Sequence, residues 1–180
     1  PPRRILAMIH KNEARLCSVG WFRTAERENF ARYSTPIHVD RPHIVLANSD
    51  AWAAVSAKGA LLTLMDDPDL RLGLVDGYSY GTYLDALIAA RQGPTNTDSL
   101  DASQLLRMLA VRRVDFALFD REEADAMVTG NESAKALRTV FLNGMPEGQR
   151  RHLICSLQVS EAEIKAINAV IAREPRTVRR

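Results

Sequence analysis

Short apolar segments alternate with helix-forming segments along the chain, and this alternation restricts the fold more than any other feature of the sequence. The apolar segments occupy residues 14–22, 70–75, 114–119 and 151–157, with helical patterns between them. They lack the period-two alternation of half-buried strands, which is typical of strands covered on both faces of a sheet. The sequence therefore predicts an α/β fold in which the strands pair largely in parallel.

Capping residues and helix breakers predict where the helices begin and end. Residues 94–99, "PTNTDS", lie between two such helices and are expected to form a polar loop. The predicted helices, each with the residue expected to start, cap or end it, are 2–12 (Pro2), 24–33 (Thr24), 51–66 (Ser49 or Asp50), 82–93 (Gly93), 102–111 (Asp101), 122–128 (Gly130) and 161–173 (Ser160 with Glu163).

Composition excludes several classes of protein. Hydrophobic residues make up 46% of the 180 residues, which suits a folded domain, and a net charge of +2 gives no basic surface for nucleic acid. No apolar run approaches the roughly 20 residues of a membrane span. The chain begins with Pro1 instead of Met and shows no signal-peptide pattern, so we expect an excised or truncated chain.

Two cysteines, Cys17 and Cys155, lie in separate strand-like segments. No C-x-x-C motif or Cys/His cluster accompanies them, so we expect no metal site. Taken alone, the pattern favours two small buried core residues over a disulfide, which would need an oxidising compartment.

The first candidate binding group lies where the strand 14–22 gives way to a helix. The guanidinium of Arg27 can form a planar, bidentate pair with a ligand carboxylate, and the hydroxyl of Thr24 can cap the helix or donate to the same anion. The alternative is that Arg27 pairs with an acid on a solvated helix face, and for a lone arginine this alternative is the better one. The acids within reach would be Glu26, Glu28 or Asp125.

Two further strand ends carry polar groups, and ligands of open parallel sheets bind at such ends. "DGYSYG", residues 76–81, offers backbone N–H groups at a helix start but lacks a nucleotide-binding pattern, and its alternative is a plain turn with Ser79 as helix cap. Asp120 can accept from a ligand ammonium, although a helix cap is the better interpretation on its own. Aromatic residues gather at the same ends and can stack on a ligand or fill the core: Trp21, Phe22, Tyr78, Tyr80 and Phe119.

The order of these segments resembles bacterial extracellular solute-binding proteins of the polar amino-acid type. "EARLCSVGWFRTAERENFARYSTPI" is similar to their signature stretch, with matches at Thr24, Arg27, Ser34 and Pro36, although Arg15 stands where the family usually has Asp. Three later segments resemble the family's second-lobe turn, its cleft-facing Asp and its last strand and helix: "LRLGLVDGYSYGTYLDAL", "VRRVDFALFDREEADAMV" and "HLICSLQVSEAEIKAINAVIA".

The resemblance implies a type II periplasmic-binding-protein fold, in which two α/β lobes close on a solute. Residues 1–42 and 145–180 would form lobe one, and residues 43–144 would form lobe two. Arg27 would hold the ligand carboxylate with help from Thr24, Gly20 and Phe22, and Tyr78 and Ser79 would bind the same carboxylate. Asp120 would take the ammonium, and the aromatic walls would be Trp21, Phe22 and Phe119.

One departure concerns lobe one, because the family normally has a longer segment before the signature stretch. We therefore expect lobe one to be incomplete, with exposed strand edges that favour a homodimer or aggregation. We also expect weak or absent solute binding by this length of chain. The resemblance also implies a periplasmic location, a membrane permease or sensor as partner, no nucleic acid and no cofactor. In that compartment a Cys17–Cys155 disulfide becomes the favoured interpretation.

Two other functions remain open at this point. An enzyme on the same fold, such as a dehydratase or lyase, needs a positioned acid or base, and none of the four histidines stands at a strand end beside a matched acid. The sequence therefore predicts no catalytic residue. The effector or sensor domain of a regulator shares the fold, and a DNA-binding or membrane-spanning segment in a longer product would identify it.

Overall fold

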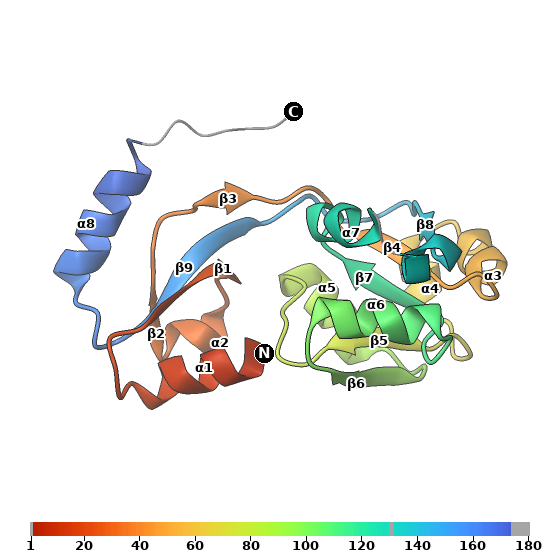
Figure 1. Cartoon of the computed structure of the whole chain (residues 1–180), viewed down its shortest axis with the longest axis horizontal. Coiled ribbons are helices and arrows are strands. Elements are labelled where there is room, and N and C mark those ends of the chain that lie inside the picture. Colours follow the sequence, from red (N-terminus) through yellow and green to blue (C-terminus); the bar gives the residue numbers. More distant parts are fainter. Residues whose placement is uncertain (1, 130–131, 174–180) are drawn as a thin grey trace. The chain divides into compact units, whose positions relative to one another are not determined.

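The computed structural model describes residues 2–129 and 132–173, which fall into two compact units (Figure 1). Unit 1 is built on Arg41–Glu147, and unit 2 is built on Arg3–Asp40 and Gly148–Arg180. The assignment of these units to the two expected lobes, with boundaries at 42/43 and 144/145, stays a prediction.

Unit 1 contains a sheet of five strands in the order β6-β5-β7-β4-β8. Strand β5 pairs in parallel with β6 and β7, whereas β4 runs antiparallel to β7 and β8. The strands of the sheet are β4 (Ile44–Ala47), β5 (Leu72–Val75), β6 (Thr95–Ser99), β7 (Phe116–Phe119) and β8 (Arg138–Val140).

Helices cover both faces of this sheet, so its central strands are buried on both sides (Figure 1). Phe116 and Leu118 of β7 pack with helices α3 to α5, while the alternate residues Ala117 and Phe119 pack with α6 and α7. The two-faced burial predicted from the apolar runs is therefore confirmed for 70–75 and 114–119. It is wrong for the run 14–22, where only Trp21 and Phe22 of the strand Cys17–Phe22 are buried. The helices are α3 (Trp52–Ala57), α4 (Leu61–Met65), α5 (Thr82–Ala90), α6 (Ala102–Ala110), α7 (Arg121–Val128) and the 3-10 helix η1 (Glu132–Ala136).

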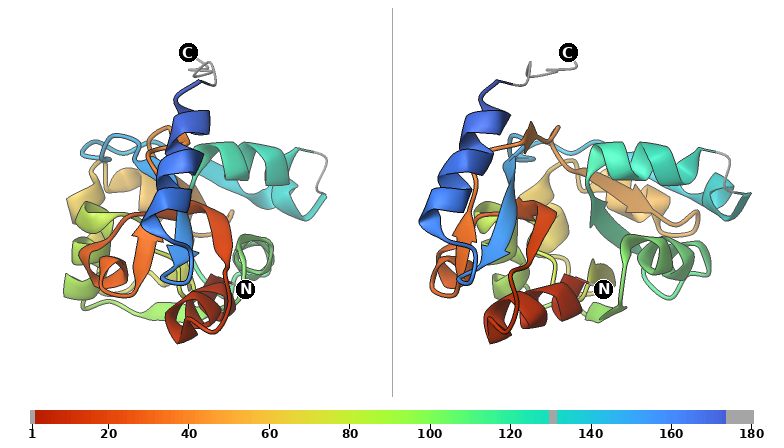
Figure 2. Two further views of the ribbon diagram at one scale, coloured as in Figure 1. Left: turned by 90° about the vertical axis from the view of Figure 1, so that its left-hand side faces the viewer. Right: turned by 60° about the vertical axis from the view of Figure 1, so that its left-hand side comes forward.

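Unit 2 is organised around β9 (Arg150–Ser156), which pairs antiparallel with three other strands. Figure 2 shows β9 (blue) beside β1 (red-orange) in two further views. Its other elements are α1 (Pro2–Lys11), β1 (Cys17–Phe22), α2 (Ala25–Glu28), β2 (Ala31–Tyr33), β3 (His38–Val39) and α8 (Glu161–Ile171).

The disulfide favoured through the family resemblance is confirmed. Cys17 of β1 lies directly opposite Cys155 of β9 in the strand register, and their sulfur atoms are 2.04 Å apart. The bond joins an outer strand of unit 2 to the strand on which the unit is built, across a sequence separation of 138 residues.

The prediction of largely parallel pairing is wrong. Among the described strands, only β5 pairs in parallel, with β6 and β7, and every pairing in unit 2 is antiparallel. An apolar run without period-two alternation indicates burial on both faces, but it carries no information on the direction of the neighbouring strand. The expected α/β class itself is confirmed.

The single helix expected over 51–66 is also wrong, because two short helices, α3 and α4, take its place. Gly59 adopts a positive φ of 67° and Ala60 is extended, which ends one helix and starts the next. The expected caps Ser49 and Asp50 are replaced by Asn48, whose Oδ1 accepts from the backbone N–H of Asp50 and Ala51 at 3.0 and 2.8 Å.

Two other boundaries differ from the expectation. Residues 95–99 form the edge strand β6 instead of a polar loop, and the helix expected to reach residue 93 ends at Ala90, with Arg91 extended behind it. The helix expected over 24–33 stops at Glu28, and residues 31–33 form β2. For residues 95–99 and 31–33, pairing with a neighbouring strand overrides local preference. The expected stop at Gly130 lies outside the described residues.

The side-chain caps expected at the other helix starts are confirmed. Thr24 and Asp101 accept from the third residue of their helices, at Arg27 and Gln104. Ser160 and Glu163 form the reciprocal capping box. In the described part of the chain, no helix is long and apolar enough to cross a membrane, and no cluster of His, Cys, Asp or Glu suits a metal ion.

Arg91 ties two helices of unit 1 to the sheet. Its Nη1 donates to the carbonyl oxygens of Leu64 and Met65, at 3.1 and 2.5 Å, and its Nη2 donates to that of Leu70. The guanidinium carbon lies 5.4 Å from the ring centroid of Phe116. Desolvation lowers the pKa of Arg91 from its ordinary value, although arginine keeps its charge throughout the physiological range.

We expect a charge-dependent contribution to stability from Asp67, whose side chain is 9% exposed. A hydrogen bond from Lys58, opposed by burial and assisted by the N–H groups of Leu70 and Asp69, lowers the pKa of Asp67 to about 2. Because this folded-state pKa is below the unfolded one, the stabilisation is complete above about pH 4 and is lost as the pH falls through 2. Asp67→Asn should lower the free energy of unfolding by about 1–2 kcal/mol at pH 5 and by much less at pH 2.

Urea unfolding at the two pH values measures this effect. Asp69→Asn is the matched control, since Asp69 is exposed two residues away and its side chain makes no described hydrogen bond. If Asp67→Asn lowered the free energy of unfolding equally at both pH values, the ionised Asp67–Lys58 pair would not be the source of the stabilisation.

Candidate functional site

The candidate residues of unit 2 gather where β1 ends and α2 begins. Trp21 and Phe22 are 9% and 4% exposed, and Thr24 Oγ1 accepts from the backbone N–H of Arg27 at 3.3 Å. Arg27 is 8% exposed; its Nη1 donates to the carbonyl oxygen of Phe22 at 3.4 Å, and its Cζ lies 5.2 Å from the Trp21 ring centroid. The structure thus brings these four residues together.

The alternative in which Arg27 lies on a solvated helix face is wrong. It is Arg23, with a side chain 57% exposed, that pairs with Glu28. The guanidinium of Arg27 instead turns toward the strand end and rests on an indole ring. A positive charge held in an apolar setting of this kind attracts an anion more strongly than a solvated one does.

Gly20 is held by a residue that the sequence did not single out. Its carbonyl oxygen accepts from Arg151 Nη1 at 2.9 Å, while Arg151 Nε lies 2.8 Å from both carboxylate oxygens of Asp40. The guanidinium of Arg151 also lies over the Phe22 ring, 4.7 Å from its centroid. Arg151 therefore fixes the end of β1, although in the sequence it stands only as the second of two adjacent arginines, Arg150 and Arg151.

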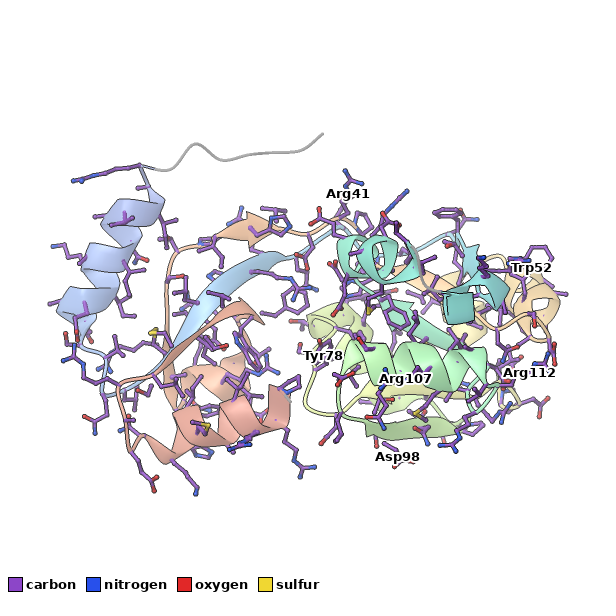
Figure 3. All side chains as sticks on the ribbon, in the orientation of Figure 1. Arg41, Trp52, Tyr78, Asp98, Arg107 and Arg112 are labelled. Carbon is purple, nitrogen blue, oxygen red and sulfur yellow. A yellow bond between two sulfur atoms is a disulfide. The ribbon has the colours of Figure 1, made fainter. Side chains whose placement is uncertain are left out.

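The turn that leads into α5 carries the next two candidates, Ser79 and Tyr78. Tyr78 is labelled in Figure 3. Tyr78 is 38% exposed. Ser79 Oγ donates to Asp85 Oδ2 at 2.5 Å and accepts from the N–H of Gly81 at 3.2 Å. The simple alternative, Ser79 as helix cap, is wrong, because the N-cap position belongs to Gly81.

Tyr80 anchors this turn to the sheet. Its hydroxyl oxygen accepts from the backbone N–H of Val75 at 2.9 Å, and burial raises the pKa of the phenol well above its ordinary value. The ring is 5% exposed and lies near the rings of His43 and Tyr78, at centroid distances of 6.1 and 6.2 Å. Tyr80 therefore stays a neutral structural residue at the base of the turn.

Phe119 ends β7, the strand beside β5, and Asp120 follows it. Asp120 Oδ1 accepts from the N–H of Glu123 at 2.9 Å and caps α7, as the alternative interpretation held. Phe119 is 2% exposed and packs in the core with α6. Because β5 and β7 are parallel, the 76–81 turn and Asp120 follow the same edge of the unit 1 sheet.

Comparison with known proteins identifies the fold. The sequence matches no protein-family model and no curated protein, but 369 solved chains match the structure. One is an amino acid ABC transporter substrate-binding protein, AbpA from Streptococcus pneumoniae, bound to L-arginine. Its TM-score is 0.71 at 16% identity, over 93% of this chain and 65% of that one.

Two other matches have a comparable score. The periplasmic VFT2 domain of BvgS from Bordetella pertussis has a TM-score of 0.69 at 15% identity, over 96% of this chain and 67% of that one. An arginine 3rd transport system periplasmic binding protein from Legionella pneumophila has a TM-score of 0.68 at 17% identity, over 92% and 69%.

The chain has the type II periplasmic-binding-protein fold. It spans about two thirds of the length of these neighbours, which agrees with the expected incomplete lobe one.

Proposed function

We propose that the protein is an extracytoplasmic solute-binding protein that recognises a small polar solute, an amino acid or a related carboxylate. The observation that carries this proposal is the buried guanidinium of Arg27, seated on Trp21 at the end of β1. A guanidinium in such a setting is suited to a planar carboxylate.

The named neighbours support the same class of ligand. Solved structures with this fold include AbpA bound to L-arginine and an ancestral arginine-binding protein bound to glutamine. A periplasmic domain of BvgS has the same fold, and the proposal covers both transport and sensing. We accordingly propose a membrane permease or a sensor as the partner, a periplasmic location that suits the disulfide, and binding without catalysis.

We propose distinct roles for the candidate residues. Arg27 holds the carboxylate and Thr24 positions Arg27 through its backbone N–H. Trp21 and Phe22 provide apolar surface beside it. Asp120 takes the ammonium, because an ionised carboxylate is the kind of acceptor that pairs with such a cation.

A homodimer is a further part of the proposal. Among the described strands, β1 pairs with β9 on one side, and its Val19 is 69% exposed. A strand edge of this kind favours pairing with another chain, and a second copy of the same chain is the simplest partner.

We expect Arg27→Met to abolish amino-acid binding, with a loss of at least about 100-fold in affinity, because the ligand carboxylate would lose a charge-assisted pair. Ligand-observed NMR with L-arginine, L-glutamine and the other common amino acids measures weak binding directly. Urea unfolding of the same variant shows whether unit 2 remains folded.

Arg23→Met is the matched control. It removes an arginine four residues away that pairs with Glu28, and it should leave affinity within about twofold. Equal affinity in Arg27→Met and the wild type would contradict the role of Arg27. A wild-type protein that binds none of the amino acids would contradict the proposed function.

A further inference from the structure

Strand β1 is bulged just before the candidate residues of unit 2. Its pairing register with β9 shifts between Ser18 and Trp21, so that two residues of β1 stand opposite one residue of β9. Gly20, inside this bulge, adopts a φ of 88°, which residues other than glycine rarely adopt. A bulge bends its strand and re-aims the side chains that follow. The geometry of this bulge therefore sets where Trp21 and Phe22 lie.

Arg151 of β9 links the bulge to a second strand. In the strand register it stands beside Phe22 of β1 and beside His38 of β3. Its Nη1 donates to the carbonyl oxygen of Gly20 at 2.9 Å, and its guanidinium lies 4.7 Å from the centroid of the Phe22 ring. Its Nε lies 2.8 Å from both carboxylate oxygens of Asp40, which directly follows β3. One guanidinium thus joins the ends of β1 and β3.

The Asp40–Arg151 pair fixes the orientation of that guanidinium. The side chain of Asp40 is 2% exposed and that of Arg151 is 26% exposed, while His38 Nε2 lies farther from Asp40, at 3.7 Å. A carboxylate buried to this extent needs its cation, because a buried charge without a partner is costly. A planar guanidinium can meet a carboxylate, a carbonyl oxygen and a ring at once, whereas a lysine ammonium lacks both the plane and the fork.

Phe22 connects this arrangement to Arg27. The carbonyl oxygen of Phe22 accepts from Arg27 Nη1 and from the Tyr33 hydroxyl, each at 3.4 Å. The ring of the same residue carries the guanidinium of Arg151. Trp21, the residue before it, carries the guanidinium of Arg27 at 5.2 Å. A shift of the bulge would therefore move both the acceptor and the ring on which Arg27 rests.

We propose that Arg151 is a positioning residue for the binding of the ligand carboxylate: it holds the bulge of β1 and thereby sets the position of Arg27. The inference rests on the proposed function of Arg27 and concerns unit 2 alone. Arg151 acts through Phe22 and Trp21 and is assigned no contact with the ligand. Its replacement should weaken amino-acid binding even where unit 2 keeps its stability.

Arg151→Lys separates positioning from charge. The lysine keeps a cation for Asp40, but it cannot also hold the Gly20 carbonyl and cover the ring, so each common amino acid that the wild type binds should bind at least about fivefold more weakly. Ligand-observed NMR measures the affinity, and urea unfolding should show a folded unit 2. Arg151→Gln with Asp40→Asn, which removes both charges together, serves if the lysine variant does not fold.

Arg150→Lys is the matched control, since Arg150 is the exposed neighbour of Arg151 in β9. Its affinity should stay within about twofold of the wild type.

The indole N–H signal of Trp21 tests the positioning without any ligand. The chain has two tryptophans, and Trp52 of unit 1 serves as the internal reference. Because the Trp21 ring lies beside the guanidinium of Arg27, its signal reports a displacement of that group. Arg151→Lys should shift the Trp21 signal and leave the Trp52 signal in place, whereas Arg150→Lys should shift neither.

Wild-type affinity in Arg151→Lys overturns the proposal, and so does an unshifted Trp21 signal in that variant. An equal loss of affinity in Arg150→Lys also overturns it, because the loss would then not depend on the bulge. A wild type that binds no amino acid rejects the proposed function, and the Trp21 signal then still decides whether Arg151 positions the group beside that ring.

Discussion

Replacing both cysteines, as Cys17→Ala with Cys155→Ala, should lower the free energy of unfolding of unit 2 by about 3–5 kcal/mol. The bond closes a loop of 138 residues, so its loss restores many conformations to the unfolded chain. It also joins β1 to β9, the strand with which every other strand of unit 2 pairs. If unit 1 stays folded while unit 2 unfolds, the flexible part of the loop closed by the disulfide is shorter. The expected loss of stability then lies nearer 3 kcal/mol, roughly, than 5.

The two tryptophans separate the response of the two units. Trp21 lies in unit 2 and Trp52, labelled in Figure 3, lies on α3 of unit 1. In a Trp52→Phe background, urea unfolding followed by fluorescence reports unit 2 alone. The urea concentration at the midpoint of unfolding should be lower in the double cysteine variant. It should fall by the same amount when the disulfide of the protein with both cysteines is reduced.

Thiol counting under denaturing conditions is the direct check on the bond. Two titratable thiols in an unreduced sample would show that the pair does not form. An unchanged midpoint after reduction would show that the bond forms but adds nothing to stability.

Phe116→Ala should destabilise unit 1 by about 3–5 kcal/mol, the range for deleting a buried aromatic ring. Phe116 has no exposed surface, and it lies on the central strand β7 opposite Ala47 of β4 and beside Leu72 of β5. Its ring also supports the guanidinium of Arg91, which holds the C-terminal carbonyls of α4. The substitution therefore removes both a core ring and the surface on which that clamp rests.

Urea unfolding followed by Trp52 fluorescence, in a Trp21→Phe background, measures this loss in unit 1. Phe141→Ala is the matched control, because Phe141 is 73% exposed and contacts Arg121 at the surface, 5.8 Å from the ring centroid. It should cost less than about 0.5 kcal/mol. Phe116→Leu, which keeps most of the volume, should lie between the two and stays informative if the alanine variant fails to fold. Similar values for Phe116→Ala and Phe141→Ala would contradict the assigned packing.

The sequence identified several helix caps correctly, including the one beside Arg27. The spacing of Thr24 and Arg27 after a strand led to the cap at Thr24, and the capping residues Asp101, Ser160 and Glu163 were recognised as well. These interactions span three residues or fewer, so the side chain that makes each of them can be read from the local order of residues.

The sequence did not show that Arg151 holds Gly20, because the two residues are separated by 131 positions and meet only when β1 pairs with β9. It also missed Asp85, six residues after Ser79, because a carboxylate one turn into a helix commonly serves the helix start alone. Arg151 fixes the end of β1, and Asp85 holds the turn that follows β5. From the sequence alone, both residues resemble ordinary surface charges.

The sequence by itself determined the alternation of buried strands and capped helices, and hence the α/β class, because apolar runs and caps act over a few residues. Tertiary structure alone decided that β4 runs antiparallel to β7, that the polar residues 95–99 form an edge strand, and that Asp85 fills the 76–81 turn. The physical reason is that these features depend on which distant segments meet in the folded chain. Strands pair through backbone hydrogen bonds, which do not depend on the side chains that a sequence displays.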